Sequence, residues 1–508
     1  MVPGWRYIHC KIHAVQFYPC VYLDGDDVDD GGKFSARVHR ADPGRHTHPG
    51  NSTWRKAGKY SVGVPAKNLA MTTRNLGVLW AQYGPYHFAR VEALRRQAAL
   101  EGGWNVHALE MGSQTADYAW TRNAPFELAT LCPGAVAERL SFRAVFLAAR
   151  RVFSRLKLDV CILPSYAPKQ SLAAFLAAKT LGISTVMMNE SHAGTARARG
   201  ISALVKSRLV RAFDAGLVGG QPQKRYFESL GMPPEKIFTG YDAVDNDFFS
   251  EKSDGIRAAS AWWRARFSLP ERYFLSLGRF VAKKNLSTLI EAYGEWRAGR
   301  PPEPVHLVMV GSGEEEVPLK ALCRKYHLPI YDHAGAKGQS QAPETVAEQP
   351  GVHFYGFRQI EENPVFYALA EAFVLPSAWE EWGLVVNEAM ACKLPVVVSD
   401  VVGCAEDLLP VLNKSDLKSH PDSVMAGMRT NGFVFPPGSA AGLKKILARL
   451  ASDPDLRLTM GQAGRQIVES VSCGVFARNA LASARAALGV PSGVFEKVGE
   501  PAGTVRHP

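Results

Sequence analysis

The sequence predicts an α/β protein with two doubly wound domains, each built on a parallel β-sheet, that face a cleft. Short apolar runs alternate with helical patterns along most of the chain, which is typical of a parallel sheet covered by helices on both faces. A glycine turn follows the first strand of each of two such series, as in nucleotide-binding folds. The 508 residues exceed one core and suffice for two domains of about 200 residues with extensions.

The first series begins at Asn75, where NLGVLWAQYG reads as a buried strand ending in Gly84. A helical pattern follows over 89–100. Further buried strands are predicted at 159–165, 183–189 and 214–220. Residues 1–70 have little periodicity and contain the acidic run DGDDVDDGG, so we expect them to be poorly ordered. A solvated loop is favoured for this run over a metal site, because Val28 stands where a calcium loop needs an oxygen ligand.

The second series begins with YFLSLGR at 273–279 and continues through VHLVMVGSG, VHFYGF, AFVLPS and LPVVVSD to GFVFPP. Each of these runs is short, apolar and closed by glycine, proline or a polar residue, as buried parallel strands are. The polar stretch before this series is expected to form a hinge between the two domains.

Composition narrows the function classes. The formal charge of +11 would suit nucleic acid, an anionic membrane or phosphorylated substrates, but no basic cluster is interleaved with aromatics, so no nucleic-acid partner is expected. No apolar run reaches the roughly 18 residues of a membrane span and the N-terminus lacks a signal-peptide layout, so a cytoplasmic location is expected. The eight cysteines show no CxxC pairing and indicate neither zinc nor disulfides.

One helix leaves a membrane contact open as an alternative. The stretch SFRAVFLAARRVFSRLK, at 141–157, has an apolar stripe with arginines mostly elsewhere, a pattern that can lie on anionic lipid. Packing of the stripe on the sheet is favoured, because this is the usual arrangement in an α/β domain.

The segment PSAWEEWGLVVNEAM, at 376–390, places Glu380 and Glu388 around a predicted strand-to-helix turn. The run AEAFVLPS reads as the strand, and a helix is predicted to begin at Gly383. Carboxylates repel a diphosphate but accept hydroxyl protons, which suits ribose and hexose. The N–H groups at the helix start suit the phosphate between them. The pattern therefore predicts a site for a sugar nucleotide.

A second motif, SLGRFVAKKN at 276–285, places Arg279 and Lys284 between a strand that ends in Gly278 and the helical pattern LSTLIEAYGEW. A nucleotide diphosphate gains negative charge as its bond to a sugar breaks. Two fixed cations near a helix N-terminus stabilise that charge without a metal.

These motifs resemble the retaining glycosyltransferases of the large family 4, which have the GT-B fold of two Rossmann-like domains. The resemblance rests on WGLVVNEAMA with the following LPVVVSDVVG, and on a Gly-Arg-x-x-x-x-Lys pattern that selects Lys284 over Lys283. It covers roughly 75–490. Two positions depart from the family pattern: Glu381 stands where a small residue or proline is usual, and Lys393 where glycine is usual. The second is a helix end that favours a left-handed residue.

The resemblance implies that Glu388 binds the ribose hydroxyls, that Glu380 touches the transferred sugar, and that Arg279 and Lys284 hold the diphosphate. A glycine turn near 311 and the segment 356–358 are expected near the nucleotide. The donor-binding residues implied are Gly278, Arg279, Lys284, Gly311, Gly356, Phe357, Glu380, Gly383, Leu384, Val385 and Glu388.

In the first domain the resemblance implies an acceptor side at Gly84, His87 and Arg90. Glu190 and His192 follow a predicted strand end, where open α/β sheets bind ligands, and a hydrogen bond to a sugar hydroxyl is expected there. The residues expected to act in catalysis are Arg279, Lys284, Glu380, His192 and Glu190.

The domain organisation that follows is an extension at 1–70, a Rossmann-like acceptor domain at 71–250, a hinge at 251–268, a Rossmann-like nucleotide-sugar domain at 269–471, a helix that crosses back at 472–490 and a tail at 491–508. The implied activity is retaining transfer of a sugar from a nucleotide diphosphate to a hydroxyl acceptor, with no metal or other cofactor. The alternatives are another GT-B sugar-nucleotide enzyme, such as an epimerase, and a catalytically silent scaffold that binds sugar nucleotides. Donor base, sugar, acceptor and oligomeric state are left open by these motifs.

Overall fold

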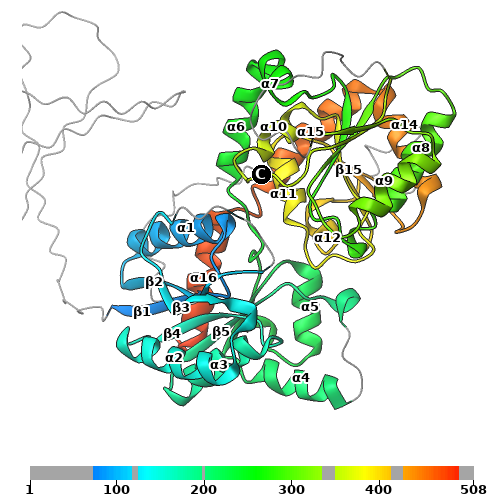
Figure 1. Ribbon diagram of the computed structural model, residues 1–508. Coiled ribbons are helices and arrows are strands. Elements are labelled where there is room, and N and C mark those ends of the chain that lie inside the picture. The colour runs from blue at the N-terminus through cyan, green and yellow to red at the C-terminus, as the bar shows by residue number, and fades with distance from the viewer. Residues whose placement is uncertain are drawn as a thin grey trace, which may run out of the picture. The chain divides into compact units, whose positions relative to one another are not determined.

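The computed structural model describes residues 73–116, 120, 124–196, 201–333, 349–412 and 427–490 (Figure 1). The predictions for the extension at 1–70 and the tail at 491–508 lie outside the described residues.

The first sheet has seven strands in the order β3-β2-β1-β4-β5-β6-β7, and all of its pairings are parallel. Its strands are β1 (Arg74–Trp80), β2 (Trp104–Gln114), β3 (Ala129–Val136), β4 (Val160–Pro164), β5 (Ser184–Asn189), β6 (Ala215–Val218) and β7 (Ile237–Phe238). The helices that follow them include α1 (Pro85–Glu101), α2 (Phe142–Arg155), α3 (Lys169–Thr180), α4 (Ile201–Arg211) and α5 (Gln221–Ser229). Helix α1 begins at Pro85, before the predicted start at 89, because Gly84 caps it and proline suits the first helical position.

The second sheet has eight strands in the order β10-β11-β9-β8-β12-β13-β15-β14, with β14 alone antiparallel among the described pairings. Its strands are β8 (Tyr273–Leu277), β9 (His306–Val310), β10 (Ile330–Asp332), β11 (Val352–Phe354), β12 (Ala372–Leu375), β13 (Val396–Ser399), β14 (Met428–Arg429) and β15 (Gly432–Phe435). Its helices include α8 (Leu286–Ala298), α9 (Glu316–Lys325), α10 (Asn363–Leu369), α11 (Leu384–Ala391), α12 (Ala405–Leu408), α14 (Ala440–Ser452) and α15 (Pro454–Val468). The predicted GT-B class of two parallel-sheet α/β domains is confirmed.

Each sheet separates two hydrophobic clusters. In β1, Leu79 belongs to the cluster formed with α2 and α3, whereas the adjacent Val78 belongs to the cluster formed with α1. In β9, Val308 and Leu307 divide in the same way between the two clusters of the second sheet. Successive side chains of a strand point to opposite faces, so a strand buried on both faces reads as a continuous apolar run.

Residues 251–268, predicted as a polar hinge, lie in helices α6 (Asn246–Ala258) and α7 (Ser260–Phe267). Helix α6 packs against α10 and α11, and Phe249 and Ile256 are buried there. Helix α16 (Cys473–Ala487) packs against α1 and against strands of the first sheet, as Figure 1 shows. The chain therefore leaves the first sheet before α6 and returns to it through α16.

Strand order reverses once inside each sheet, and this reversal positions the candidate site. In the first sheet β2 and β4 lie on opposite sides of β1. In the second sheet β9 and β12 lie on opposite sides of β8. Loops at the carboxyl ends of strands on the two sides of such a switch point diverge, which leaves room for a ligand between them.

No helix in the part of the chain that the structure describes is long and apolar enough to span a bilayer. On α2 the apolar stripe is buried through Val145, Ala149, Val152 and Phe153, which lie in the cluster that also includes α3. The prediction that this stripe packs inside the domain is confirmed. Four of its arginines, Arg143, Arg150, Arg151 and Arg155, are exposed.

Candidate functional site

The loops after β8 and β12 lie side by side at the switch point of the second sheet. The Ala378 N–H donates to Lys283 O at 2.8 Å, and Asn285 Nδ2 donates to Pro376 O at 3.1 Å. Asn285 adopts a left-handed φ of 50° where it ends the 3₁₀ turn that carries both lysines. These bonds bring the two sequence-predicted donor motifs to one place.

Glu380 lies in the loop after β12 with 6% of its surface exposed. Its Oε2 accepts hydrogen bonds from Lys284 Nζ at 2.5 Å and from Ser377 Oγ at 3.0 Å, and Lys283 Nζ lies 3.6 Å from Oε1. Burial alone would raise the pKa of Glu380, but the charges of Lys284 and Lys283, with the bonds from Lys284 and Ser377, hold the pKa below its ordinary value. Glu380 is therefore ionised at neutral pH, and Lys284, predicted as a diphosphate ligand, is paired with it.

The neighbouring Glu381, which departs from the family pattern, completes a group of four charges. Lys283 Nζ donates to Glu381 Oε2 at 2.7 Å, so each lysine has a carboxylate partner. Lys283 also reaches Glu380, which means that it can balance either carboxylate.

Glu388 lies on α11 and is fully buried. The Tyr86 hydroxyl, on α1, donates a hydrogen bond to its Oε1, while Oε2 is buried without a hydrogen-bond partner among the described residues. Burial raises the pKa of Glu388 to about 7, although the bond from Tyr86 acts in the opposite direction. The carboxylate predicted to bind ribose is thus covered by Tyr86 in this structure.

Three glycines predicted to face the nucleotide pack against one another at the ends of β8, β9 and β11. The Gly278 N–H donates to Val310 O at 2.9 Å, and the Gly311 N–H donates to Gly356 O at 2.8 Å. A Cβ on Gly311 would lie 1.8 Å from Gly278 O, and its φ of +137° also disfavours a side chain. Close approach of the strand ends therefore requires glycine at 311 before any ligand is considered.

The start of α11 has the geometry that the sequence predicts. Gly383 caps the helix with a left-handed φ of 104°, and Leu384 and Val385 are half-buried against the core. At the other end, Lys393 adopts the left-handed conformation with a φ of 54°. The expectation that lysine accepts this conformation in place of glycine is confirmed.

Arg279 follows Gly278 directly after β8 and is half-buried. Phe357 lies beyond the end of β11 with 39% of its surface exposed, and its ring meets that of Trp120 edge to face at 5.1 Å. Both residues lie at the carboxyl edge of the second sheet. Their predicted contacts with the diphosphate and the base stay predictions.

His192 contacts the loop that carries Glu380. The Gly194 N–H donates to His192 Nδ1 at 3.2 Å, so the proton of the neutral ring is on Nε2, which lies 3.0 Å from Glu380 O and donates to it. Glu190, two residues earlier, lies beside Asp242, and burial raises the pKa of both carboxyl groups. Of these two predicted residues, His192 is thus brought to Glu380 through its backbone.

The acceptor-side residues predicted at the start of α1 make internal contacts. The Gly84 N–H donates to His87 Nδ1 at 2.9 Å, and the His87 ring stacks on Trp80 with centroids 4.6 Å apart. Burial, and then the charge of Arg90, lower the pKa of His87 to about 3. His87 is therefore neutral at physiological pH.

Arg90 is 1% exposed. Its Nε donates to Ala243 O at 2.8 Å, its guanidinium lies 4.9 Å from the centre of the Tyr241 ring, and its Nη2 is 4.0 Å from Asp242 Oδ1. A buried cation of this kind needs such partners to offset its desolvation. In this structure Arg90 contacts the segment that leads from β7 to α6.

Sequence reasoning missed three contributors: Tyr86, which bonds to Glu388; Asp242, which lies between Arg90 and Glu190; and the pair Trp382 and Asn387, joined at 3.0 Å. Tyr86 belongs to the glycine-loop segment YGPYHFAR, and its polar hydroxyl beside a predicted ligand loop was the available signal. Among the described residues, no group of three or more His, Cys, Asp or Glu side chains is placed to hold a metal.

Comparison with known proteins assigns the second sheet and its helices. Residues 271–453 match the family described as glycosyl transferases group 1. An alpha-D-kanosaminyltransferase of Streptomyces kanamyceticus is 30% identical over 233 residues, which is 46% of this chain and 49% of that protein. A D-inositol 3-phosphate glycosyltransferase of Salinispora arenicola is 26% identical over 235 residues, 46% of each chain. The chain thus spans about half the length of these curated relatives.

Solved structures match over most of the chain at low identity. A sucrose-phosphate synthase of Thermosynechococcus elongatus superposes with a TM-score of 0.57 at 18% identity, covering 80% of this chain and 96% of the other. HepE of Anabaena, crystallised with UDP-glucose, gives 0.52 at 16% identity over 80% and 98%. These likenesses establish the fold.

Proposed function

We propose that the chain is a retaining glycosyltransferase of family 4 that moves a sugar from a nucleotide diphosphate to a hydroxyl of a glycan, a lipid-linked acceptor or a small molecule. The observation that carries the proposal is the convergence of Arg279, Lys284 and Glu380 at the switch point between β8 and β12, beside the capped start of α11. Its support from comparison is the match to glycosyl transferases group 1 and the transferases among the curated relatives.

In the proposed reaction the acceptor oxygen bonds to the anomeric carbon on the face that the diphosphate leaves. The bond from that carbon to the diphosphate oxygen breaks, and the acceptor proton passes to the leaving phosphate. Arg279, Lys284 and the backbone N–H groups at the start of α11 stabilise the charge that develops, so that no metal is required. Glu380 accepts a hydroxyl proton of the sugar.

Donor binding would rearrange the two lysine–glutamate pairs. Lys284 must turn from Glu380 toward the diphosphate, which would leave a buried carboxylate uncompensated. Lys283 already lies 3.6 Å from Glu380 Oε1 and can take over its charge. Glu388 likewise becomes available to ribose when Tyr86 moves from its Oε1.

A donor and acceptor screen tests the proposal, with UDP, GDP and ADP sugars as donors; UDP-glucose is included because HepE, which has this fold, was crystallised with it. Arg279→Ala should lower turnover several hundred-fold, because one such cation contributes about 3 to 4 kcal/mol at the transition state. Arg324→Ala, on the exposed face of α9, is the matched control and should leave turnover unchanged.

Each alternative predicts a different result. A change in the donor sugar without any acceptor would indicate an epimerase. Donor binding without turnover would indicate a silent scaffold. Turnover of Arg279→Ala within threefold of the parent would refute the assignment of this arginine.

A further inference from the structure

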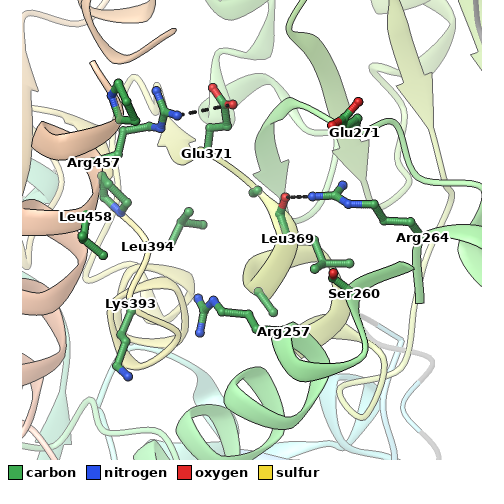
Figure 2. Close-up of a pocket in the computed structure, with 14 residues that line it drawn as sticks. Arg257, Ser260, Arg264, Glu271, Leu369, Glu371, Lys393, Leu394, Arg457 and Leu458 are labelled. Carbon is green, nitrogen blue, oxygen red and sulfur yellow. Dashed lines mark hydrogen bonds and ion pairs between the residues drawn. The ribbon is translucent and has the colours of Figure 1, made fainter. Parts of the chain in front are cut away.

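A pocket of about 440 Å³ lies at the opposite edge of the second sheet from the candidate site (Figure 2). It is bordered by the residues that precede three adjacent strands: Glu271 before β8, Leu369 to Glu371 before β12, and Leu394 with Pro395 before β13. The donor motifs follow the carboxyl ends of β8 and β12, so the pocket at the amino ends of these strands is a separate place.

The lining of this pocket carries an excess of positive charge. Four cations, Arg257, Arg264, Lys393 and Arg457, face two carboxylates, Glu271 and Glu371. Glu371 is already bonded by Arg272, whose Nη2 donates to Oε2 at 3.0 Å from outside the lining. The charge of the cations is therefore only partly balanced.

Backbone carbonyls hold the guanidinium groups in position without neutralising them. Arg264 donates to Pro270 O at 2.6 Å and to Leu369 O at 3.1 Å. Arg257 donates to Cys392 O at the end of α11, and Arg457 donates to Leu450 O. Groups fixed in this way lose little conformational freedom when they bind an anion, which favours binding.

The floor of the pocket is apolar. In Figure 2 the side chains of Arg257, Arg264 and Arg457 lie around Leu369 and Leu394. An apolar floor strengthens charge interactions above it and accepts the carbon skeleton of a ligand.

We propose that this pocket binds a small organic phosphate, whose phosphate is held by the arginines while its apolar part packs on Leu369, Leu394 and Leu458. Guanidinium groups match phosphate in geometry and remain charged, whereas an uncharged ligand would leave the positive groups unpaired. The site does not depend on the proposed transferase activity.

The simplest explanation without a ligand is that the arginines only cap helix ends and loops. It accounts for the contacts of Arg257 with Cys392 O and of Arg457 with Leu450 O. It does not account for an open pocket in front of them in which Lys393, 40% exposed on its side chain, and Arg264 add further charge.

Calorimetric titration of the full chain tests the proposal, with phenyl phosphate as probe and with inorganic phosphate and phenol as comparisons. Phenyl phosphate should bind at least tenfold more tightly than inorganic phosphate, because only the former also uses the apolar floor, and phenol should not bind. Ser260→Asp places a negative charge at the first residue of α7, inside the lining, and should weaken phenyl phosphate at least tenfold. An acid at a helix start is tolerated or favourable, so this variant should fold.

Two further variants decide where the probe binds. Lys393→Asn removes one cation and keeps a residue that accepts a positive φ, and should weaken binding about threefold. Arg279→Ala lies at the other edge of the sheet and should leave phenyl phosphate affinity unchanged. The proposal is overturned if Arg279→Ala abolishes binding, if Ser260→Asp leaves it intact, or if phenol binds as well as phenyl phosphate.

Discussion

Replacing Glu388 with glutamine tests whether this carboxylate is as deeply buried as the structure has it. Burial raises its pKa from 4.5 to about 7. In the unfolded chain the group ionises at its ordinary pKa, whereas in the folded protein it keeps its proton up to the raised value. The stability that this group contributes is therefore present below about pH 4.5 and is lost as the pH rises to about 7.

The size of the effect follows from the two pKa values. A difference of about 2.5 corresponds to about 3 kcal/mol at roughly 1.4 kcal/mol for each pKa unit. Glutamine has no such dependence, so Glu388→Gln should gain about 3 kcal/mol over the parent between pH 4.5 and pH 8. The amide may leave its NH₂ unpaired at every pH, so the change with pH, rather than the absolute stability, is the quantity compared.

Urea unfolding of both proteins at pH 5 and at pH 8 measures this change. Glu380→Gln is the matched control, because the pKa of Glu380 is lowered instead of raised. Losing this carboxylate should destabilise the protein at both pH values, since its pairing with Lys284 and Lys283 is already present above its ordinary pKa. If the stability difference between Glu388→Gln and the parent is the same at pH 5 and pH 8, Glu388 is not buried as described.

Two further predictions concern stability. Gly311→Ala should cost more than about 2 kcal/mol in urea unfolding, because its Cβ would meet Gly278 O at 1.8 Å; Gly255→Ala in α6, with open space around it, should instead add up to about 1 kcal/mol, and equal effects would contradict this account. Burial lowers the pKa of His306 to about 4, so up to about 3 kcal/mol of stability present above pH 6.5 should be lost between pH 6.5 and pH 4. His306→Gln should flatten thermal unfolding midpoints over this range, and an unchanged slope would refute the assignment.

The donor half of the site was predictable because its residues follow strand ends in short continuous motifs. The run after β12 predicts the turn, the start of α11 at Gly383 and the position of Glu388 on its first turns, and the structure confirms these local features. A left-handed residue at Lys393 was also readable, since a helix end there leaves few other conformations.

The pairing of these residues was not predictable in the same way. Lys284 and Glu380 were read as ligands of two different parts of a donor, yet they neutralise each other when no donor occupies the site. Tyr86 bonds to Glu388 across 302 positions of sequence. Contacts of this kind depend on how separate elements pack, and local periodicity carries no information about that.

The first sheet shows how the same limitation changes the meaning of single residues. Arg90 and His192 were read as groups that face a ligand, but each is used to hold a backbone carbonyl, Ala243 O and Glu380 O respectively. Asn387 on α11 likewise donates to Asp242 O at 3.2 Å. Polar residues beyond the strand ends of one sheet thus fix the segments that carry the charged groups of the other. Because a cation positioned about 1 Å away loses much of its effect on a transition state, such contacts would matter to turnover even where they never touch a substrate.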